Sequence, residues 1–288
     1  MRQKTYAKIA LFVTAMLWGS TFSIGKLATE AFSPSFIIAL RFTVASIVLV
    51  IVAAPLYKQL NRRYWIDGIW MGVTLFGGYI LQVGGLALDT SPGKSAFLCT
   101  SYCIMVPFVH WLATRKKPEI SHILSVFICM IGIGVLSLRG GWGMSMGDIL
   151  TVLSGVPSAV NIVISSIVCK NKNPLILTTI ELCVVALLAW VVVGFSGTFP
   201  AAFPLETVGG IVYLGLFATA LCLYLQSFGL KYAAPAVGGM ILSLESVFGV
   251  IFAMILYHEK ITPRMFLGFG LIFVAIVLSQ REPKTEQA

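Results

Sequence analysis

Charged residues are scarce in this chain, and their scarcity excludes an ordinary soluble domain. Asp, Glu, Lys and Arg make up 11% of the 288 residues, whereas hydrophobic residues make up 58%. A soluble domain carries about 25% charged and roughly 45–50% apolar residues. Nearly the whole chain consists of stretches close to the about 20 apolar residues that cross a bilayer as a helix. The composition therefore indicates an integral membrane protein.

Motifs for metal, nucleotide and nucleic-acid chemistry are also missing. The six cysteines form no CxxC pair, and the three histidines show no ligand spacing, so we expect no metal and no other cofactor. There is no GxxxxGK[ST] loop, which argues against transport driven directly by ATP on this chain. The basic residues are dispersed over loops rather than gathered on one face, which argues against nucleic acid.

The apolar stretches predict an all-α integral membrane protein with ten transmembrane helices. Short connections leave no room for a separate soluble domain, and helices satisfy the backbone polar groups within lipid. No small-residue cleavage site is clear after the first span, so we expect it to be retained rather than removed as a signal peptide. The predicted spans are residues 7–28, 34–55, 68–88, 93–114, 120–138, 148–169, 174–195, 207–228, 235–257 and 262–280.

The basic residues favour one side of the membrane. With a cytoplasmic N-terminus, fourteen Lys and Arg residues fall on the cytoplasmic side and five on the opposite side. Cytoplasmic loops carry such an excess of basic residues. We therefore predict a multi-pass protein of the plasma (inner) membrane with both termini in the cytoplasm.

One short string occurs twice, at an interval of half the chain. "LQVGGL" (81–86) returns as "LQSFGL" (225–230), 144 positions later. Arg41 follows a span-opening proline by seven residues, and Glu181 does the same 140 positions later. Such matches keep their order along both halves, as expected for a duplicated architecture.

Each half holds five spans, an odd number, so the second half must enter the membrane from the opposite side. We therefore predict two inverted five-helix repeats, residues 1–142 and 143–288. Inverted repeats recur in secondary transporters, whose substrate site lies at the repeat interface near the midplane. The glycines in the repeated string, Gly85 and Gly229, would let helices approach closely.

Three segments carry a resemblance to a known family. They are "LWGSTFSIGKLA" (17–28), "LRF" (40–42) and "LESVFGVIFAMILYHEKIT" (244–262). With them the chain resembles the EamA-type ten-helix permeases of the drug/metabolite transporter superfamily, over essentially its whole length. The resemblance implies two EamA-like repeats, export of small metabolites or amino acids, and a cavity lined by spans one, three, four, six, eight and nine. The chain departs from the family at Ser246, where Pro is common, and at His258, where Gly is common.

Ionisable side chains inside spans are costly and are functional candidates by default. Arg41, Glu181 and Glu245 are the three that stand out, and the first two occupy equivalent positions in the repeats. One interpretation makes Arg41 and Glu181 a pair of gating or coupling charges. The other lets them snorkel, Arg41 outward and Glu181 inward, to interfacial water. The resemblance favours the second, since their spans are peripheral in that family.

Glu245 and Tyr102 correspond to one another at about mid-depth in spans nine and four. A bare carboxylate at that depth is unfavourable, so we expect Glu245 to be neutral, to be paired with a donor such as Tyr102, or to face water. We expect it to be needed for the conformational cycle and to be a coupling or gating residue. Whether it also binds a proton as coupling ion, or a cationic solute, is left open.

Aromatic and amide side chains complete the predicted substrate site. Rings supply apolar contact for a small organic solute, and amides fix its orientation. Tyr79 and Gln82 of span three are expected near the outer mouth. Tyr224 and Gln226 of span eight are expected near the inner mouth. The candidate substrate-binding residues are Trp18, Tyr79, Gln82, Tyr102, Asn161, Tyr224, Gln226 and Glu245.

A secondary transporter that moves a small organic solute by alternating access, as an exporter, is the leading function. The alternative is an intramembrane enzyme acting on lipid or a lipid-linked substrate, which would need a cluster of His, Asp or Glu near one membrane face. Asp67, Asp89 and Asp148 are instead expected to be isolated capping residues near span ends. We therefore predict a transporter without enzyme activity. Its substrate, direction, coupling ion and oligomeric state are left open.

Overall fold

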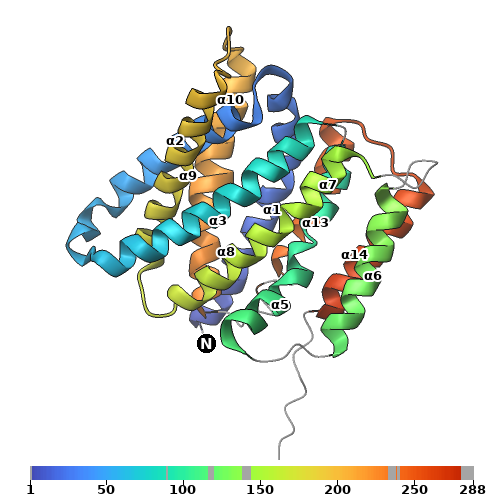
Figure 1. The fold of residues 1–288 in the computed structure, drawn as a ribbon, viewed down its shortest axis with the longest axis horizontal. Helices are drawn as coiled ribbons and strands as arrows, with labels where there is room; N and C mark the ends of the chain where they lie inside the picture. The colour runs from blue at the N-terminus through green and yellow to red at the C-terminus, as the bar shows by residue number, and fades with distance from the viewer. Residues whose placement is uncertain are drawn as a thin grey trace, which may run out of the picture.

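The structure is a computed structural model in which every regular element of the described residues is a helix (Figure 1). The described residues are 2–88, 90–115, 120–137, 144–232, 238 and 241–279. The helices are α1 (Arg2–Ala31), α2 (Pro34–Ala53), η1 (Ala54–Gln59), α3 (Arg62–Ala87), α4 (Pro92–Cys99), α5 (Tyr102–Thr114), α6 (Ile120–Ser137), α7 (Met146–Leu153), α8 (Gly155–Val168), α9 (Pro174–Ser196), α10 (Leu205–Tyr213), the π-helix η2 (Leu214–Leu221), α11 (Cys222–Tyr232), α13 (Glu245–Leu256) and α14 (Pro263–Ser279).

Seven helical segments of the described residues are long and apolar enough to cross a membrane. They lie within α1, α2 with η1, α3, α4 with α5, α7 with α8, α9, and α10 through α11. Three shorter apolar helices lie within α6, α13 and α14. The prediction of a multi-pass, all-helical membrane protein is thereby confirmed, while the number of ten spans stays a prediction.

Asparagine and serine caps set where two of the long helices begin. The Ser33 hydroxyl accepts the backbone N–H of Phe36 at 3.3 Å, and Pro34 is the first residue of α2. The Asn173 side chain caps α9 in the same way, and Pro174 follows it. Proline suits the first helical position, where its missing N–H would have no partner in the helix. The two proline-opened spans therefore begin where the sequence predicted.

A short turn interrupts the fourth predicted span. α4 ends at Cys99 and α5 begins at Tyr102, with Thr100 and Ser101 between them. The N–H of Cys103 donates to the carbonyl of Thr100 at 3.0 Å, an i to i+3 bond typical of a 3₁₀ turn. A stretch of this kind inside a longer helix often marks a hinge.

The ninth predicted span carries the same interruption. α13 begins at Glu245, and the N–H of Ser246 donates to the carbonyl of Ser243 at 3.2 Å. The Ser246 hydroxyl bonds the same carbonyl at 2.7 Å. The break therefore forms without the proline that is common after this glutamate in the resembling family. Tyr102 and Glu245 are each the first helical residue after a turn of this kind.

Two prolines lie inside helices, Pro107 in α5 and Pro157 in α8, and they affect the helices differently. Pro157 lies two residues inside α8, and α7 ends at Leu153, the residue whose carbonyl would have received the missing N–H bond. Proline removes this bond and breaks the helix there. α5 in contrast continues through Pro107 without a break.

α13 ends in a turn at His258, whose φ is +51°. Residues other than glycine seldom adopt this left-handed conformation. It occurs at the position where the resembling family commonly has glycine. The chain therefore keeps the turn geometry without the residue that forms it most readily.

α1 lies in the middle of the bundle (Figure 1). α1 packs against α3, α11 and α13, while α6 and α14 lie side by side at one edge. One apolar core gathers residues of α2 and α9, and another gathers residues of α4, α5 and α14. Residues of both cores line the candidate site.

Glycines allow the closest helix contacts. A Cβ atom on Gly85 of α3 would lie 2.3 Å from the Thr151 hydroxyl of α7, and one on Gly229 of α11 would lie 2.5 Å from Leu11 Cγ of α1. Neither contact has room for a methyl group. The close approach predicted for these two glycines is confirmed.

We predict that Gly85→Ala destabilises the protein, whereas Gly84→Ala does not. The added methyl group at Gly85 meets Thr151 and the carbonyl of Gly147 at 2.7 Å, and such overpacking costs about 1–3 kcal/mol. At Gly84 the nearest atom is Leu150 Cδ1 at 3.8 Å, so alanine should be neutral or stabilising by up to about 1 kcal/mol. Thermal unfolding of the purified variants in detergent measures both. Equal melting temperatures for the two variants would contradict the packing described.

Candidate functional site

A polar cavity of about 60 Å³ lies where α1, α3, α4, α5, α8, α11 and α13 meet. These helices belong to predicted spans one, three, four, six, eight and nine. Seven of the eight predicted substrate-binding residues line the cavity, all except Tyr224. The full lining is Trp18, Thr21, Phe22, Leu75, Tyr79, Gln82, Cys99, Tyr102, Ser158, Asn161, Ile162, Gln226 and Glu245.

Glu245 is the one ionisable carboxyl in this lining, and it is 4% exposed. The Thr100 hydroxyl donates to its Oε1 atom at a long 3.4 Å. The ion pairs found among the described residues, Lys94 with Asp148 and Lys172 with Asp67, do not include it. The Thr100 hydroxyl also donates to the Ala96 carbonyl at 2.7 Å, its shorter bond. The Tyr102 hydroxyl, the donor expected from the sequence, interacts with the Glu245 carboxyl as well.

One further polar atom in the cavity lining lacks a partner. The Gln226 Oε1 atom is buried without a hydrogen bond among the described residues. Buried polar groups are nearly always bonded, to protein, to water or to a ligand. A donor-bearing solute or water at this place would satisfy Gln226.

Arg41 lies behind the cavity wall, 4% exposed. Its Nε atom donates to the Thr219 hydroxyl at 2.5 Å, and its Nη2 atom donates to the Tyr79 hydroxyl and the Ala218 carbonyl, each at 3.3 Å. Its Cζ atom stands 4.8 Å from the centre of the Tyr79 ring. Arg41 therefore points into the protein, and the interpretation that it snorkels outward is wrong.

The π-helix η2 supplies the partners of Arg41. A π-helix shifts backbone bonding from i+4 to i+5, and the Thr219 hydroxyl donates to the Leu214 carbonyl five residues earlier at 2.8 Å. The Ala218 carbonyl also accepts the indole N–H of Trp18 at 2.9 Å. η2 thus joins Arg41 to the cavity wall, an element that no sequence pattern predicted.

Glu181 is buried as well, 2% exposed, in α9. The Asn161 side-chain amide donates to Glu181 Oε1 at 2.7 Å and to the Met71 carbonyl at 2.9 Å. Because Asn161 lines the cavity, Glu181 touches the cavity wall from behind. The interpretation that Glu181 snorkels inward is also wrong, and its role as a gating or coupling charge stays a prediction.

Two residues of predicted span eight, Tyr224 and Gln226, lie elsewhere than expected. Tyr224 lines a separate apolar groove with residues such as Val48 and Leu175. Two residues along a helix are about 200° apart, so Tyr224 cannot share the direction of Gln226. Gln226 lines the same cavity as Gln82, whereas the two were expected near opposite mouths.

A buried ion pair lies at the end of the bundle where α3 finishes and α4 begins, here called the α3–α4 end. Lys94 Nζ lies 2.5 Å from Asp148 Oδ2, and both side chains are buried. The Thr90 hydroxyl donates to Asp148 Oδ1 at 3.1 Å. Asp148 is therefore not an isolated cap. The sequence could not show this pair, because its members belong to different predicted repeats.

Two more polar ties lie at the α3–α4 end. Glu259 accepts the Ser91 hydroxyl at 2.6 Å and the Gly93 N–H at 3.1 Å, which places a carboxylate on the N-terminus of α4. A negative charge there is favoured by the helix dipole. Lys26 of α1 donates to the Leu86 carbonyl of α3 at 2.5 Å. Together the ties join α1, α3, α4, α7 and the turn after α13.

The opposite end, where α8 leads into α9, carries a smaller set. Lys172 forms an ion pair with Asp67 of α3 and donates to the Arg63 carbonyl at 3.1 Å. Lys231 of α11 donates to the Lys172 carbonyl at 3.3 Å. Asp67 is thus paired, against expectation, while Asp89 lies outside the described residues.

Comparison with known proteins places this architecture. The model of the EamA-like transporter family matches the chain twice, over residues 5–138 and 145–280. An uncharacterized transporter of Archaeoglobus fulgidus is 27% identical over 281 residues, covering 96% of this chain and 86% of that protein. The uncharacterized transporter YetK of Bacillus subtilis is 21% identical, covering 96% of this chain and 88% of YetK.

A solved crystal structure has the same fold. It superposes with a TM-score of 0.68 at 18% sequence identity, and the match covers 94% of this chain and 95% of the other. The two family matches cover nearly all the residues and establish the family. The chain belongs to the EamA-like transporter family.

Proposed function

We propose that the protein is a secondary transporter of the plasma membrane that exports a small organic solute by alternating access. The observation that carries the proposal is the central cavity, which joins polar side chains from both halves of the chain around Glu245. Its volume of about 60 Å³ holds a few waters. A metabolite would therefore enter only when helices move apart, as alternating access requires.

The proposal includes ten spans in two inverted repeats, residues 1–142 and 143–288, with both termini in the cytoplasm. Equivalent glycine contacts support the repeats. A Cβ on Gly72 of α3 would lie 2.9 Å from the Glu181 carbonyl, and one on Gly215 of η2 would lie 2.8 Å from the Arg41 carbonyl. The glycines are 143 positions apart and their partners 140. Each half thus supplies the peripheral helix on which the other half packs.

In this topology the α3–α4 end is the outer end, and we infer that the structure represents an outward-closed state. The ties of Lys94 and Glu259 hold the outer half of span four against spans six and nine. The turns at Thr100 and Ser243 divide spans four and nine near Glu245. We infer that the outer halves swing away at these turns when the outer ties break.

An intramembrane enzyme is the alternative from another class. Such an enzyme would hold a cluster of acidic or histidine side chains near one membrane face. Within the described ranges, no three His, Cys, Asp or Glu residues gather closely enough to hold a metal ion. The carboxylates at the two ends are engaged in ion pairs or helix capping. The cavity lining therefore supports transport better.

The first functional prediction concerns Glu245. Proteoliposomes are loaded with a mixture of amino acids and small organic acids. They should release at least one of these solutes faster than equally loaded liposomes without the protein, as measured by mass spectrometry. Glu245→Ala should abolish this release, because it removes the cavity carboxyl that the Thr100 turn contacts. Glu206→Ala serves as the control for loss of a carboxylate elsewhere in the chain, since Glu206 is exposed in the first turn of α10.

Glu245→Gln separates the two roles left open for this residue. The amide keeps the shape but cannot take up a proton. If Glu245 couples transport to protons, this variant should exchange solute but fail to accumulate it against a gradient under an imposed pH difference. Uphill transport by Glu245→Gln at the wild-type level would rule out proton coupling at this residue. Full activity of Glu245→Ala would rule out any role of Glu245 in the mechanism.

The second functional prediction concerns the outer closure. Cys99 lines the cavity and is buried, so a variant that keeps only this cysteine reports access from outside. Lys94→Ala leaves Asp148 buried without its ion-pair partner, which costs about 3–5 kcal/mol in buried pairs. A membrane-impermeant methanethiosulfonate added outside intact cells should then label Cys99 faster.

Lys260→Ala is the matched control, because Lys260 is an exposed lysine at the same end without an ion pair among the described residues. It should leave labelling unchanged. Asp148→Asn should speed labelling as Lys94→Ala does. If Lys94→Ala and Lys260→Ala label Cys99 at the same rate, the ion pair does not close the outer end.

A further inference from the structure

A second cavity lies on the lateral surface of the bundle, with a lining that shares no residue with the central cavity. It is an apolar groove of about 410 Å³ between the end of α2, η1, the first turn of α3 and α9. Small-molecule sites commonly have roughly 300–1,000 Å³. Its lining includes Ala53, Tyr57, Trp65, Ile176, Thr179 and Cys183.

The lining has almost no capacity for a polar ligand. The Thr179 hydroxyl is already bonded to the Leu175 carbonyl at 2.7 Å. Tyr57 and Trp65 are largely exposed aromatic residues, of the kind that gathers where hydrocarbon meets head groups. In a membrane-embedded chain, an apolar groove with such a rim is suited to an acyl chain.

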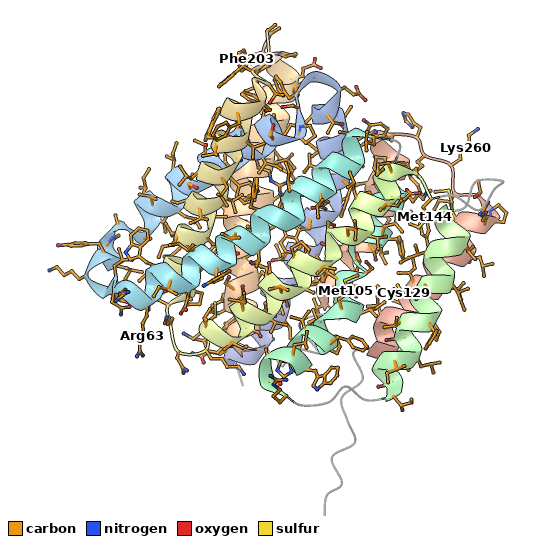
Figure 2. The ribbon with its side chains drawn as sticks, in the orientation of Figure 1. Arg63, Met105, Cys129, Met144, Phe203 and Lys260 are labelled. Atoms are coloured by element: carbon orange, nitrogen blue, oxygen red, sulfur yellow. The ribbon has the colours of Figure 1, made fainter. Side chains whose placement is uncertain are left out.

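A cluster of positive charge stands at the rim. Lys58, Arg62 and Arg63 are exposed and flank the groove residue Leu60, and Figure 2 places Arg63 at the corner where η1 leads into α3. None of their side chains has an ion-pair partner among the described residues. The neighbouring carboxylate, Asp67, is taken by Lys172.

We propose that this groove binds an anionic phospholipid. One acyl chain lies in the groove, and the phosphate head group is held by Lys58, Arg62 and Arg63. Their long stems let the charged ends reach the head-group layer, and basic residues beside a membrane attract anionic lipids in this way. The acyl chain alone gives no selectivity among lipids, because surrounding lipid is equally apolar. The three cationic side chains supply the selectivity for an anionic head group. This site goes beyond solute transport and does not depend on which solute is carried.

Native mass spectrometry of the purified protein, titrated with phosphatidylglycerol and with phosphatidylcholine of the same acyl chains, tests the proposal. Phosphatidylglycerol should bind roughly 10- to 100-fold more tightly. The variant K58Q/R62Q/R63Q should lose this preference. The variant K8Q/R115Q/K260Q removes as many exposed charges, none of them from the groove lining, and should keep it.

The groove itself is tested by Cys183→Trp, which fills it from α9, against Leu187→Trp, one turn further along on the exposed surface. Only Cys183→Trp should weaken phosphatidylglycerol binding. Variants are compared after confirming that their melting temperatures match the wild type. Soluble glycerol 3-phosphate should not compete.

Four outcomes would overturn the proposal. Equal binding of the two lipids would make the groove a place for any surrounding lipid. Equal losses in the two charge variants would make the effect one of total charge. Unchanged binding in Cys183→Trp would place the acyl chain elsewhere. Competition by glycerol 3-phosphate at the same concentration would leave an anion site without a lipid.

Discussion

Water is absent from the hydrocarbon layer, so a polar group inside the bundle must find its partner within the protein. Arg41 and Glu181 meet this constraint without an opposite charge. The π-helix η2 gives Arg41 a hydroxyl and a carbonyl, and Asn161 gives Glu181 an amide. Glu245 has only the hydroxyls of Thr100 and Tyr102. The most weakly bonded of the three ionisable side chains is therefore the one that lines the central cavity.

The helix breaks follow from the same constraint. Broken helices are tolerated in a membrane where their backbone is buried in protein or lines a cavity. The turns at Thr100 and Ser243 are closed by i to i+3 bonds, and the Ser246 hydroxyl adds a bond to the second turn. Both turns lie beside the cavity. The proposed movement of spans four and nine thus uses backbone that is already bonded outside the regular helical pattern.

Much of the cavity could be predicted from the sequence, because an amide or aromatic residue inside an apolar span is conspicuous by itself. Tyr79 and Gln82, three residues apart, share a helix face and share the cavity. Tyr224 does not line this cavity, because it leaves its helix in another direction than Gln226. The pairing of Lys94 with Asp148 and the π-helix depend on contacts between distant segments. No local pattern in the chain encodes such contacts.

The central claim is that the two ends of the bundle open in alternation. Pulsed electron paramagnetic resonance can measure it with spin labels at Leu88 and Lys260 for the proposed outer end, and at Lys8 and Arg115 for the inner end. All four residues are exposed. A transported solute, or the variant Lys94→Ala that breaks the outer ion pair, should lengthen the distance between Leu88 and Lys260. The distance between Lys8 and Arg115 should shorten in the same fraction of molecules. Distances that never change, or that lengthen together at both ends, would contradict alternating access.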